Sequence, residues 1–539
     1  MTARPIGADS AHGAGAAVDA DVLNQSVPFE DVDLLAADVP LAEALEREGA
    51  GWAVDRVRDA GLVAGSAEAQ EHGRRAERNE PRLLTHDRFG HRVDQVDLDP
   101  SWHWLLRGAV EREIHALPWR DPKPGAHVAR AALELLWTQA NAGVMCPVSM
   151  TYSAVPALRA DPVLAAEWEP RLTIPDYERG ALCGMAMTEK QGGSDVRANI
   201  TRAEPAGDGW WQLHGHKWFC SYPPCEVFLV LAQAPGGLSC FLLERGPGME
   251  FQRLKDKLGT RSLPSSEVEF RGAAARMLGE EGRGVATIIE MVTHTRLDCV
   301  IGSAAGMRRG VAEAVWHARH RSAFGARLCE QPLMRNVLAD LALESEAATA
   351  TALRLARAYD EEHNTLRRFA TAVLKYWICK RATPHAAESL ECLGGNGYVE
   401  ESPMPRLLRD SPLNGIWEGS GNVMSLDVLR AMAREPEGLP AFLAECELAR
   451  GADALLDAHL DALPRTLGAL SGGDAQWSAR RAVEDLALAF QASLLVRVAP
   501  PAVSDAFCAG RLGEARGRAY GTLPGGVDAD AVLGRALAI

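Results

Sequence analysis

Paired cysteine motifs are missing from this sequence of 539 residues. Its eleven cysteines show no Cys-x-x-Cys and no Cys/His spacing typical of zinc. This pattern argues against a metal site or a disulfide framework and favours free thiols in a reducing, cytoplasmic setting. Long apolar runs are also missing. The most apolar stretch, 227–243, is broken by Gln233, Pro235 and two glycines, so it indicates buried strands and no membrane span.

The first residues carry no apolar run behind a basic start. Segment 1–17 is rich in Gly, Ala and polar residues, so we expect a disordered tail and not a signal peptide.

Basic residues are the minority among the charged side chains. Lysine and arginine total 57, against 72 aspartates and glutamates, for a formal net charge of −15. Such a charge argues against general attraction to nucleic acid or anionic lipid, although a local basic patch remains open. The hydrophobic share of 47% is typical of a globular protein, and the length predicts several domains.

Hydrophobic periodicity predicts a mostly α-helical protein with a central β domain. Helices are expected at 103–116 and 126–142, and strands at 210–219, 226–231 and 266–270. Long helices at 286–317, 332–359 and 367–393 indicate a bundle. Helices follow at 441–470, where Pro464 predicts a break or kink, and at 479–499. The expected domains are an N-terminal helical domain (18–180), a β domain (181–276), a helical bundle (277–435) and a C-terminal helical extension (436–539).

A glycine-rich loop follows Met185 in the predicted β domain, with the sequence Met-Ala-Met-Thr-Glu-Lys-Gln-Gly-Gly-Ser-Asp. Adjacent glycines allow a close backbone approach, and loop N–H groups with the Ser194 hydroxyl can hold a phosphate. A bare Gly-Gly-Ser-Asp is usually an ordinary turn. The longer string resembles the flavin-binding signature of the acyl-CoA dehydrogenases. In this string Lys190-Gln191-Gly192 replaces the family's usual Pro-x-Ala, a variant that is similar to the AidB-type, alkylation-response branch. The resemblance runs from about Asn24 to the end of the chain.

The resemblance implies FAD, bound between the β domain and the bundle. The segment Lys217-Trp-Phe-Cys-Ser221 resembles the family's second flavin segment, with Phe219 against the flavin ring and the Ser221 hydroxyl near N5. Residues expected at the flavin from these two segments are Met185, Met187, Thr188, Gly193, Ser194, Phe219, Cys220 and Ser221.

Two further segments resemble those that complete the flavin site of a neighbouring subunit. They are Arg321-Ser-Ala-Phe-Gly, with Gln331 after it, and the loop Gly394-Gly395. The planar guanidinium of Arg321 suits a pyrophosphate, and Phe324 corresponds to the residue at the adenine end. The resemblance therefore implies a homo-oligomer, expected to be a tetramer. Ile416, Ser420 and Asn422 complete the expected flavin residues.

Glu418 is the expected catalytic base. The string Trp417-Glu-Gly-Ser-Gly-Asn422 resembles the family's Tyr-Glu-Gly-Thr-x-Gln, whose glutamate removes the α-proton of an acyl thioester. A weakly acidic C–H needs a positioned carboxylate and a polarised carbonyl. Between Trp and Gly the carboxyl can occupy an apolar cleft, where its pKa rises towards neutrality. The redox chemistry belongs to the flavin.

The C-terminal extension is rich in arginine but not basic. From Met432 onward it has ten arginines, no lysine and fourteen acidic residues. In the AidB-type branch this block is the proposed DNA-binding surface, and the candidates here are Arg480, Arg481, Arg516 and Arg518. A net acidic block is unlike a typical nucleic-acid domain, so a solvated helical surface is equally open.

Three functions fit these patterns. The first is an AidB-like flavoprotein of the DNA alkylation response that binds duplex DNA and has at most modest acyl-CoA dehydrogenase activity. The second is an ordinary catabolic dehydrogenase for a short or branched acyl-CoA. The third is a flavin-bearing binding protein without turnover.

Overall fold

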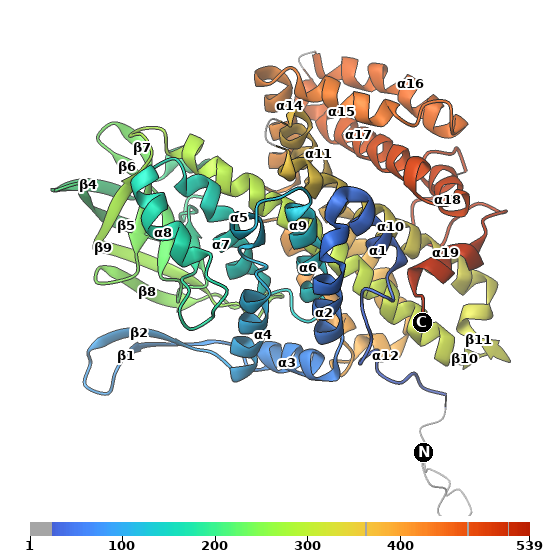
Figure 1. The fold of residues 1–539 in the computed structure, drawn as a ribbon, viewed down its shortest axis with the longest axis horizontal. Coiled ribbons are helices and arrows are strands. Elements are labelled where there is room, and N and C mark those ends of the chain that lie inside the picture. Colours follow the sequence, from blue (N-terminus) through green and yellow to red (C-terminus); the bar gives the residue numbers. More distant parts are fainter. Residues whose placement is uncertain (1–23, 362–363, 472–473, 516) are drawn as a thin grey trace, which may run out of the picture.

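The computed structural model describes residues 24–361, 364–471, 474–515 and 517–539. It is mostly α-helical, with one larger β sheet that lies at one end of the molecule beside the helices (Figure 1). This arrangement confirms the predicted fold class. The expected disordered tail, 1–17, and Arg516 lie outside the described residues. Within those ranges no helix is both long and apolar enough to cross a membrane.

The N-terminal part is helical apart from one hairpin that the sequence pattern did not predict. Helix α4 ends at Glu111, earlier than predicted, because Glu113 adopts a left-handed φ of 57° that a helix cannot continue. The helices are α1 (Val39–Leu45), α2 (Val54–Ala64), α3 (Ala67–Arg78), α4 (Pro100–Glu111), α5 (Leu117–Arg120), α6 (Ala126–Thr138), α7 (Met145–Leu158) and α8 (Pro162–Leu172). The hairpin joins β1 (Arg82–His86) and β2 (Arg92–Asp97).

The β domain is a seven-stranded sheet that closes on itself. Its strands are β3 (Cys183–Ala186), β4 (Arg202–Gly207), β5 (Trp210–Ser221), β6 (Val227–Ala234), β7 (Gly237–Glu244), β8 (Met249–Leu254) and β9 (Ser265–Leu278). The order β3-β6-β4-β5-β9-β7 is closed by a further pairing of β7 with β6. Strand β6 is buried along nearly its whole length, which explains the apolar run in the sequence. The three predicted strands are confirmed as parts of β5, β6 and β9.

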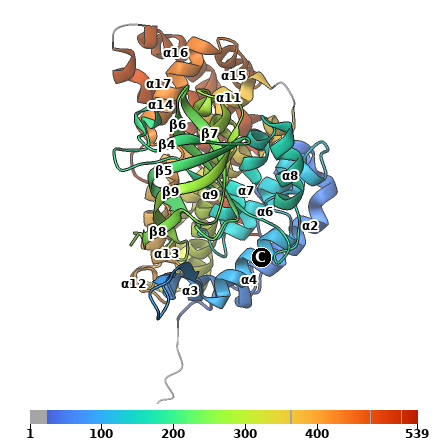
Figure 2. The ribbon, with the colours of Figure 1, turned by 90° about the vertical axis from the view of Figure 1, so that its left-hand side faces the viewer.

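The helical bundle is organised around α9 (Gly284–His320). This helix packs against α6 and α7 of the N-terminal part and against α10 and α11 of the bundle, so it joins the two sets of helices. The other elements are β10 (Ser322–Ala323), β11 (Ala326–Arg327), α10 (Pro332–Asp360), α11 (Thr365–Cys392), α12 (Gly395–Tyr398), α13 (Met404–Asp410) and α14 (Gly421–Arg434). Figure 2 shows the sheet in front of α9, with α6, α7 and α8 to one side.

The C-terminal extension packs on the bundle as five helices. They are α15 (Gly438–Glu447), α16 (Ala454–Gly468), α17 (Ala475–Val498), α18 (Pro501–Arg511) and α19 (Ala529–Ala536). Of the predicted break or kink at Pro464, the break does not occur, because α16 continues through the proline. The predicted helix is interrupted instead between α15 and α16, where Gly451 has a φ of 85°, in the left-handed region that favours glycine.

Candidate functional site

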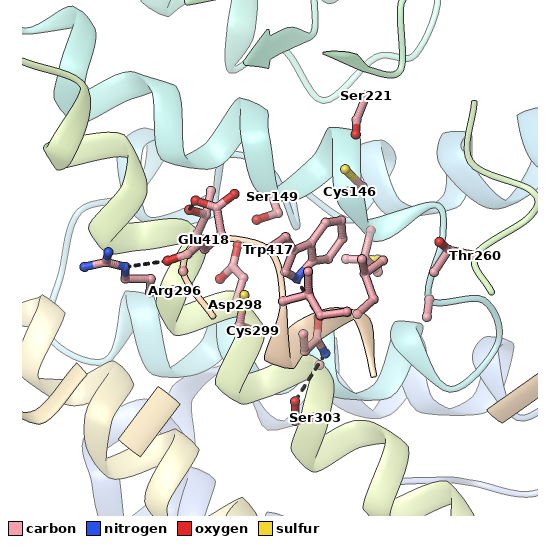
Figure 3. Close-up of a pocket in the computed structure, with 18 of the residues that line it drawn as sticks. Cys146, Ser149, Ser221, Thr260, Arg296, Asp298, Cys299, Ser303, Trp417 and Glu418 are labelled. Carbon is pink, nitrogen blue, oxygen red and sulfur yellow. Dashed lines mark hydrogen bonds between the residues drawn. The ribbon is translucent and has the colours of Figure 1, made fainter. Parts of the chain in front are cut away.

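One cavity of about 630 Å³ lies where the barrel loops meet α6, α7, α9 and the loop before α14 (Figure 3). It brings together residues that are far apart in the sequence. The predicted site residues that line it are Met185, Met187, Thr188, Gly193, Ser194, Phe219, Ser221, Ile416, Glu418 and Ser420. The cavity is therefore shared by the two barrel segments and the segment that carries the expected base.

The remaining predicted flavin residues do not line this cavity. Cys220 is fully buried in the barrel. Gly394, Gly395 and Asn422 also lie outside the lining. Arg321 donates to the carbonyl of Asn24. Phe324, in the turn between β10 and β11, is 99% exposed, and the Gln331 side chain donates to the carbonyl of Ala323 at 3.0 Å.

A buried ion pair holds the glycine-rich loop to the barrel. Lys217 Nζ lies 2.9 Å from Glu189 Oε1, and both side chains are fully buried. Lys217 also donates to the Leu231 carbonyl at 2.7 Å, and Glu189 accepts from the Ile200 amide at 2.7 Å. Burial opposes ionisation of Glu189, but the lysine and the backbone N–H groups outweigh it and lower its pKa to about 2. Burial lowers the pKa of Lys217 to about 8. The pair therefore fixes the loop to strand β5.

The wall formed by the two barrel segments fits a flavin. A Cβ at Gly193 would lie 2.4 Å from the Thr188 hydroxyl, so glycine is needed for the loop to fold back on itself. The hydroxyls of Thr188, Ser194 and Ser221 face the cavity with Phe219, whose ring is 48% exposed. Hydrogen-bonding groups beside a half-exposed aromatic ring match the needs of an isoalloxazine ring, which is flat and carries polar atoms along its edge.

Two buried cations hold Glu418 in an unfavourable backbone conformation. Its φ is 57°, in the left-handed region that non-glycine residues seldom adopt, at a cost of about 1–3 kcal/mol. Lys375 Nζ donates to the carbonyl of Trp417 at 2.9 Å and to that of Gly419. Arg296 Nε donates to the Glu418 carbonyl at 2.9 Å. Three successive carbonyls are thus fixed by side chains from α9 and α11.

The Glu418 carboxyl faces the cavity from this turn (Figure 3). Burial raises its pKa above the ordinary value of 4.5. The Thr295 hydroxyl opposes this effect, because it donates to Oε2 at 2.8 Å and so stabilises the carboxylate. A buried carboxylate with a raised pKa is a stronger base than an exposed one.

Sequence patterns alone did not identify the groups that position Glu418. Asp427 accepts from Arg296 and from Arg368, each at 2.7 Å, and so balances the charge of Arg296. The only signal for Lys375 and Arg296 was a charged residue on a helix face that is otherwise buried. Such residues can equally belong to a structural ion pair, so the signal is weak.

The candidate DNA-binding arginines differ in their surroundings. Arg480 Nε donates to Asn422 Oδ1 at 2.9 Å, which links α17 to one of the predicted flavin segments. Arg481 forms an ion pair with Asp485 at 3.3 Å, and Arg518 is exposed. Other arginines of the extension are held by carboxylates, as in the pairs of Arg450, Arg497, Arg511 and Arg535.

Comparisons with known proteins identify the family. The AidB N-terminal domain model, of the adaptive response protein, matches residues 24–189, and the middle and C-terminal domain models of acyl-CoA dehydrogenases match 184–273 and 282–433. The putative acyl-CoA dehydrogenase AidB of Escherichia coli is 42% identical over 509 residues, which span 90% of this chain and 93% of the relative.

The chain belongs to the acyl-CoA dehydrogenase family. Within this family it falls in the AidB branch, and it is an FAD-dependent acyl-CoA dehydrogenase. The expected cofactor is thereby confirmed.

Solved structures of family members share the whole fold. Caenorhabditis elegans ACDH-11, in complex with C11-CoA, superposes with a TM-score of 0.83 at 28% identity and covers 98% of this chain and 93% of that one. A Bacillus anthracis acyl-CoA dehydrogenase complexed with FAD has a TM-score of 0.70 at 16% identity and covers 90% and 89%. The second likeness concerns the fold alone.

The Glu189–Lys217 pair should be essential for the stability of the barrel. Glu189→Gln leaves a buried lysine without its counter-charge and should lower the free energy of unfolding by about 3–5 kcal/mol. In the parent, because the pKa of Glu189 is lowered, the contribution of its carboxylate is complete above pH 4.5 and is lost as the pH falls towards 2. The ion pair itself is lost as the pH rises through about 8, where Lys217 gives up its proton. Denaturant unfolding at pH 7 measures the difference. The double variant Glu189→Gln/Lys217→Met should recover part of the loss, and an unchanged midpoint in the single variant would contradict this role.

Proposed function

We propose that the protein oxidises an acyl-CoA between its α and β carbons, with Glu418 as the base that removes the α-proton. The observation that carries the proposal is the buried Glu418 carboxyl, which shares one cavity with the barrel residues that fit a flavin. Thr188, Ser194, Phe219 and Ser221 would hold the cofactor. When bound, FAD supplies the hydride acceptor for the β-carbon.

The surroundings of Glu418 suit a proton acceptor at each stage of the reaction. Before the reaction, the Thr295 hydroxyl and the cations Arg296 and Lys375 favour the carboxylate. Afterwards, burial favours the neutral acid, so the raised pKa helps the carboxyl to keep the proton that it accepts. Because the turn is fixed at three carbonyls, the carboxyl does not have to reorient.

Replacement of the base should separate binding from chemistry. Glu418→Gln keeps the shape, so FAD content should be unchanged, while the rate of flavin reduction by an acyl-CoA should fall by at least ~100-fold. In the parent this rate should rise with pH through a pKa above 4.5, because only the carboxylate accepts the proton. Thr295→Val removes the stabilising hydroxyl and should shift the profile to higher pH. Stopped-flow absorbance under anaerobic conditions measures both effects, and a parental rate in Glu418→Gln would exclude this residue as the base.

A finer proposal is that the protein acts in the DNA alkylation response, binds duplex DNA and has only modest dehydrogenase activity. The likeness to AidB over most of both chains supports it. So does one face of α17, where Trp477 is 91% exposed and Arg480 and Arg481 follow three and four residues later. The net charge of −15 opposes long-range attraction, so contact would depend on this local face.

Loss of exposed arginines should weaken DNA binding without regard to DNA sequence. In Arg481→Ala/Arg518→Ala, two phosphate contacts are lost, and the slope of log affinity against log salt should flatten by up to about two units. Fluorescence anisotropy with a labelled duplex across a salt series measures the slope. Arg450→Ala is the control, because Arg450 is held between two carboxylates, Glu447 and Asp461, whereas Arg481 pairs with Asp485 alone. If the parent does not bind DNA even at low salt, the ordinary catabolic dehydrogenase becomes the better interpretation.

The protein is also proposed to be a homotetramer. The segments of Arg321 and Gly394 lie outside the cavity of their own chain, and apolar side chains near them, Phe324, Leu333 and Tyr398, are strongly exposed. An interface that covers these side chains would bring both segments to the flavin of a second subunit.

Phe324 offers a direct test of assembly. Phe324→Ser should weaken the tetramer and lower FAD occupancy together, because the same segment would serve both. Light scattering with absorbance at the flavin band measures the two properties in one run. Trp477→Ser, which removes another exposed aromatic side chain far along the chain, serves as the control. A parent that is monomeric and fully loaded with FAD would refute the proposal.

A further inference from the structure

Three cations line one part of the cavity without forming an ion pair that neutralises them fully. They are Lys257 after β8, Arg309 on α9 and Arg406 on α13. Within the part of the chain that the structure describes, Arg406 forms neither a hydrogen bond nor an ion pair, and its Nη1 is buried without a partner. Lys257 donates to the carbonyl of Leu263 and has no carboxylate partner in the same ranges.

Only one of the three guanidinium nitrogens of Arg309 has a hydrogen-bond partner in the described residues. The residue is 5% exposed, and its Nη2 contacts Glu313 and the carbonyl of Phe29. Its Nε and Nη1 are buried and have no hydrogen-bond partner. Arg309 therefore adds positive charge near this part of the cavity, but its unpartnered nitrogens are enclosed by the protein and are not accessible to a ligand.

The nearby carboxyl groups are engaged elsewhere. Asp410 accepts from the Thr260 amide at 2.6 Å, and burial together with Glu77 raises its pKa to about 7. Glu77 accepts from the Ser262 hydroxyl and the Arg261 amide. Two other acids that line the cavity, Glu134 and Asp298, are paired with the buried Arg130. Asp410 and Glu77 lie close enough to offset part of the charge of Arg406, but neither forms an ion pair with it, so its donors stay available to a ligand.

A partly buried guanidinium without a partner opposes folding, because its desolvation is not offset by a hydrogen bond or a counter-charge. A neutral side chain of similar size would therefore stabilise the fold about as well as Arg406 does. Its donors instead suit an anionic group that enters the cavity, and a carboxylate matches the planar fork of arginine.

The cavity extends from Glu418 to these cations along α9. Thr295, which contacts Glu418, and Arg309 are fourteen residues apart on this helix, a rise of roughly 21 Å. Between them the lining includes small and apolar residues, namely Cys299, Gly302, Ala305, Gly306, Ala382, Ala386, Leu407 and Leu413. A ligand that spans the cavity from Glu418 to these cations has a reactive group at one end, an apolar middle and an anion at the other end.

We propose that Arg406, with the positive charge of Arg309 nearby, binds a carboxylate at the far end of the acyl chain, so that the preferred substrates are CoA half-thioesters of dicarboxylic acids. This inference rests on the proposed dehydrogenase function. It adds the class of acyl group to that function and makes Arg406 a residue that determines specificity.

Binding to the FAD-loaded protein tests the inference. Methyl-ended and carboxyl-ended acyl-CoAs of equal length, from six to fourteen carbons, are titrated into the Glu418→Gln holoprotein, in which turnover does not interfere. At the best length the carboxyl-ended compound should bind at least about tenfold more tightly, the scale of a hydrogen bond to a charged group. Perturbation of the flavin spectrum or calorimetry measures the affinity.

Replacement of Arg406 supplies the matched comparison. Arg406→Met should abolish the preference for the carboxyl end and leave the affinity for methyl-ended compounds unchanged, whereas Arg406→Lys should retain part of the preference. Without ligand, Arg406→Met should unfold at the same or a higher temperature than the parent, because no partner is lost. Arg309→Met provides a second, independent removal of charge.

Several results would overturn the inference. One is equal affinity of the parent for both kinds of acyl-CoA. Another is a preference that survives in both methionine variants. A third is competition by a free dicarboxylate at the same concentration as its thioester, which would indicate a site for free anions. Binding and flavin reduction by methyl-ended acyl-CoAs alone would leave the dehydrogenase function intact and refute only the carboxylate site. If no acyl-CoA binds or reduces the flavin, the proposed function fails as well.

Discussion

The site depends on the hydrogen bonds that Lys375 and Arg296 donate to the backbone carbonyls of residues 417–419. Left-handed backbone at Glu418 is unfavourable, and only the surrounding charges make it the stable state. Asp427 stabilises this arrangement, because its carboxylate neutralises the buried charge of Arg296. Because the donors belong to α9 and α11, the packing of the bundle is directly coupled to the position of the base.

In the barrel, a buried ion pair likewise fixes a loop that lines the cavity. Glu189 and Lys217 hold the glycine-rich loop, just as the cations hold the turn of Glu418. In both places the charges are satisfied within the protein. Arg406 differs from them, since its donors have no partner in the described residues. This contrast separates charges that build the site from a charge that is free to meet a ligand.

Local patterns predicted much of the fold and of the site. Periodicity located the long helices and three strands because buried faces repeat every 3.6 or 2 residues. The barrel segments and Glu418 were predicted because each resembles a contiguous family motif. The hairpin β1–β2 was missed, since its strands are short and mostly polar. Pro464 was expected to break or kink a helix, but α16 continues through it. The helix is interrupted near Gly451, whose positive φ is visible only in the structure.

The sequence by itself determined the helical and β elements, the flavin segments and the identity of the base, because each is encoded in neighbouring residues. Only the tertiary structure decided which charges are paired. Thr295, Arg296 and Lys375 come from different helices, and their role exists only where those helices meet the loop of Glu418. The same holds for Arg406: a sequence shows an arginine, but whether it lacks a partner depends on every side chain packed around it.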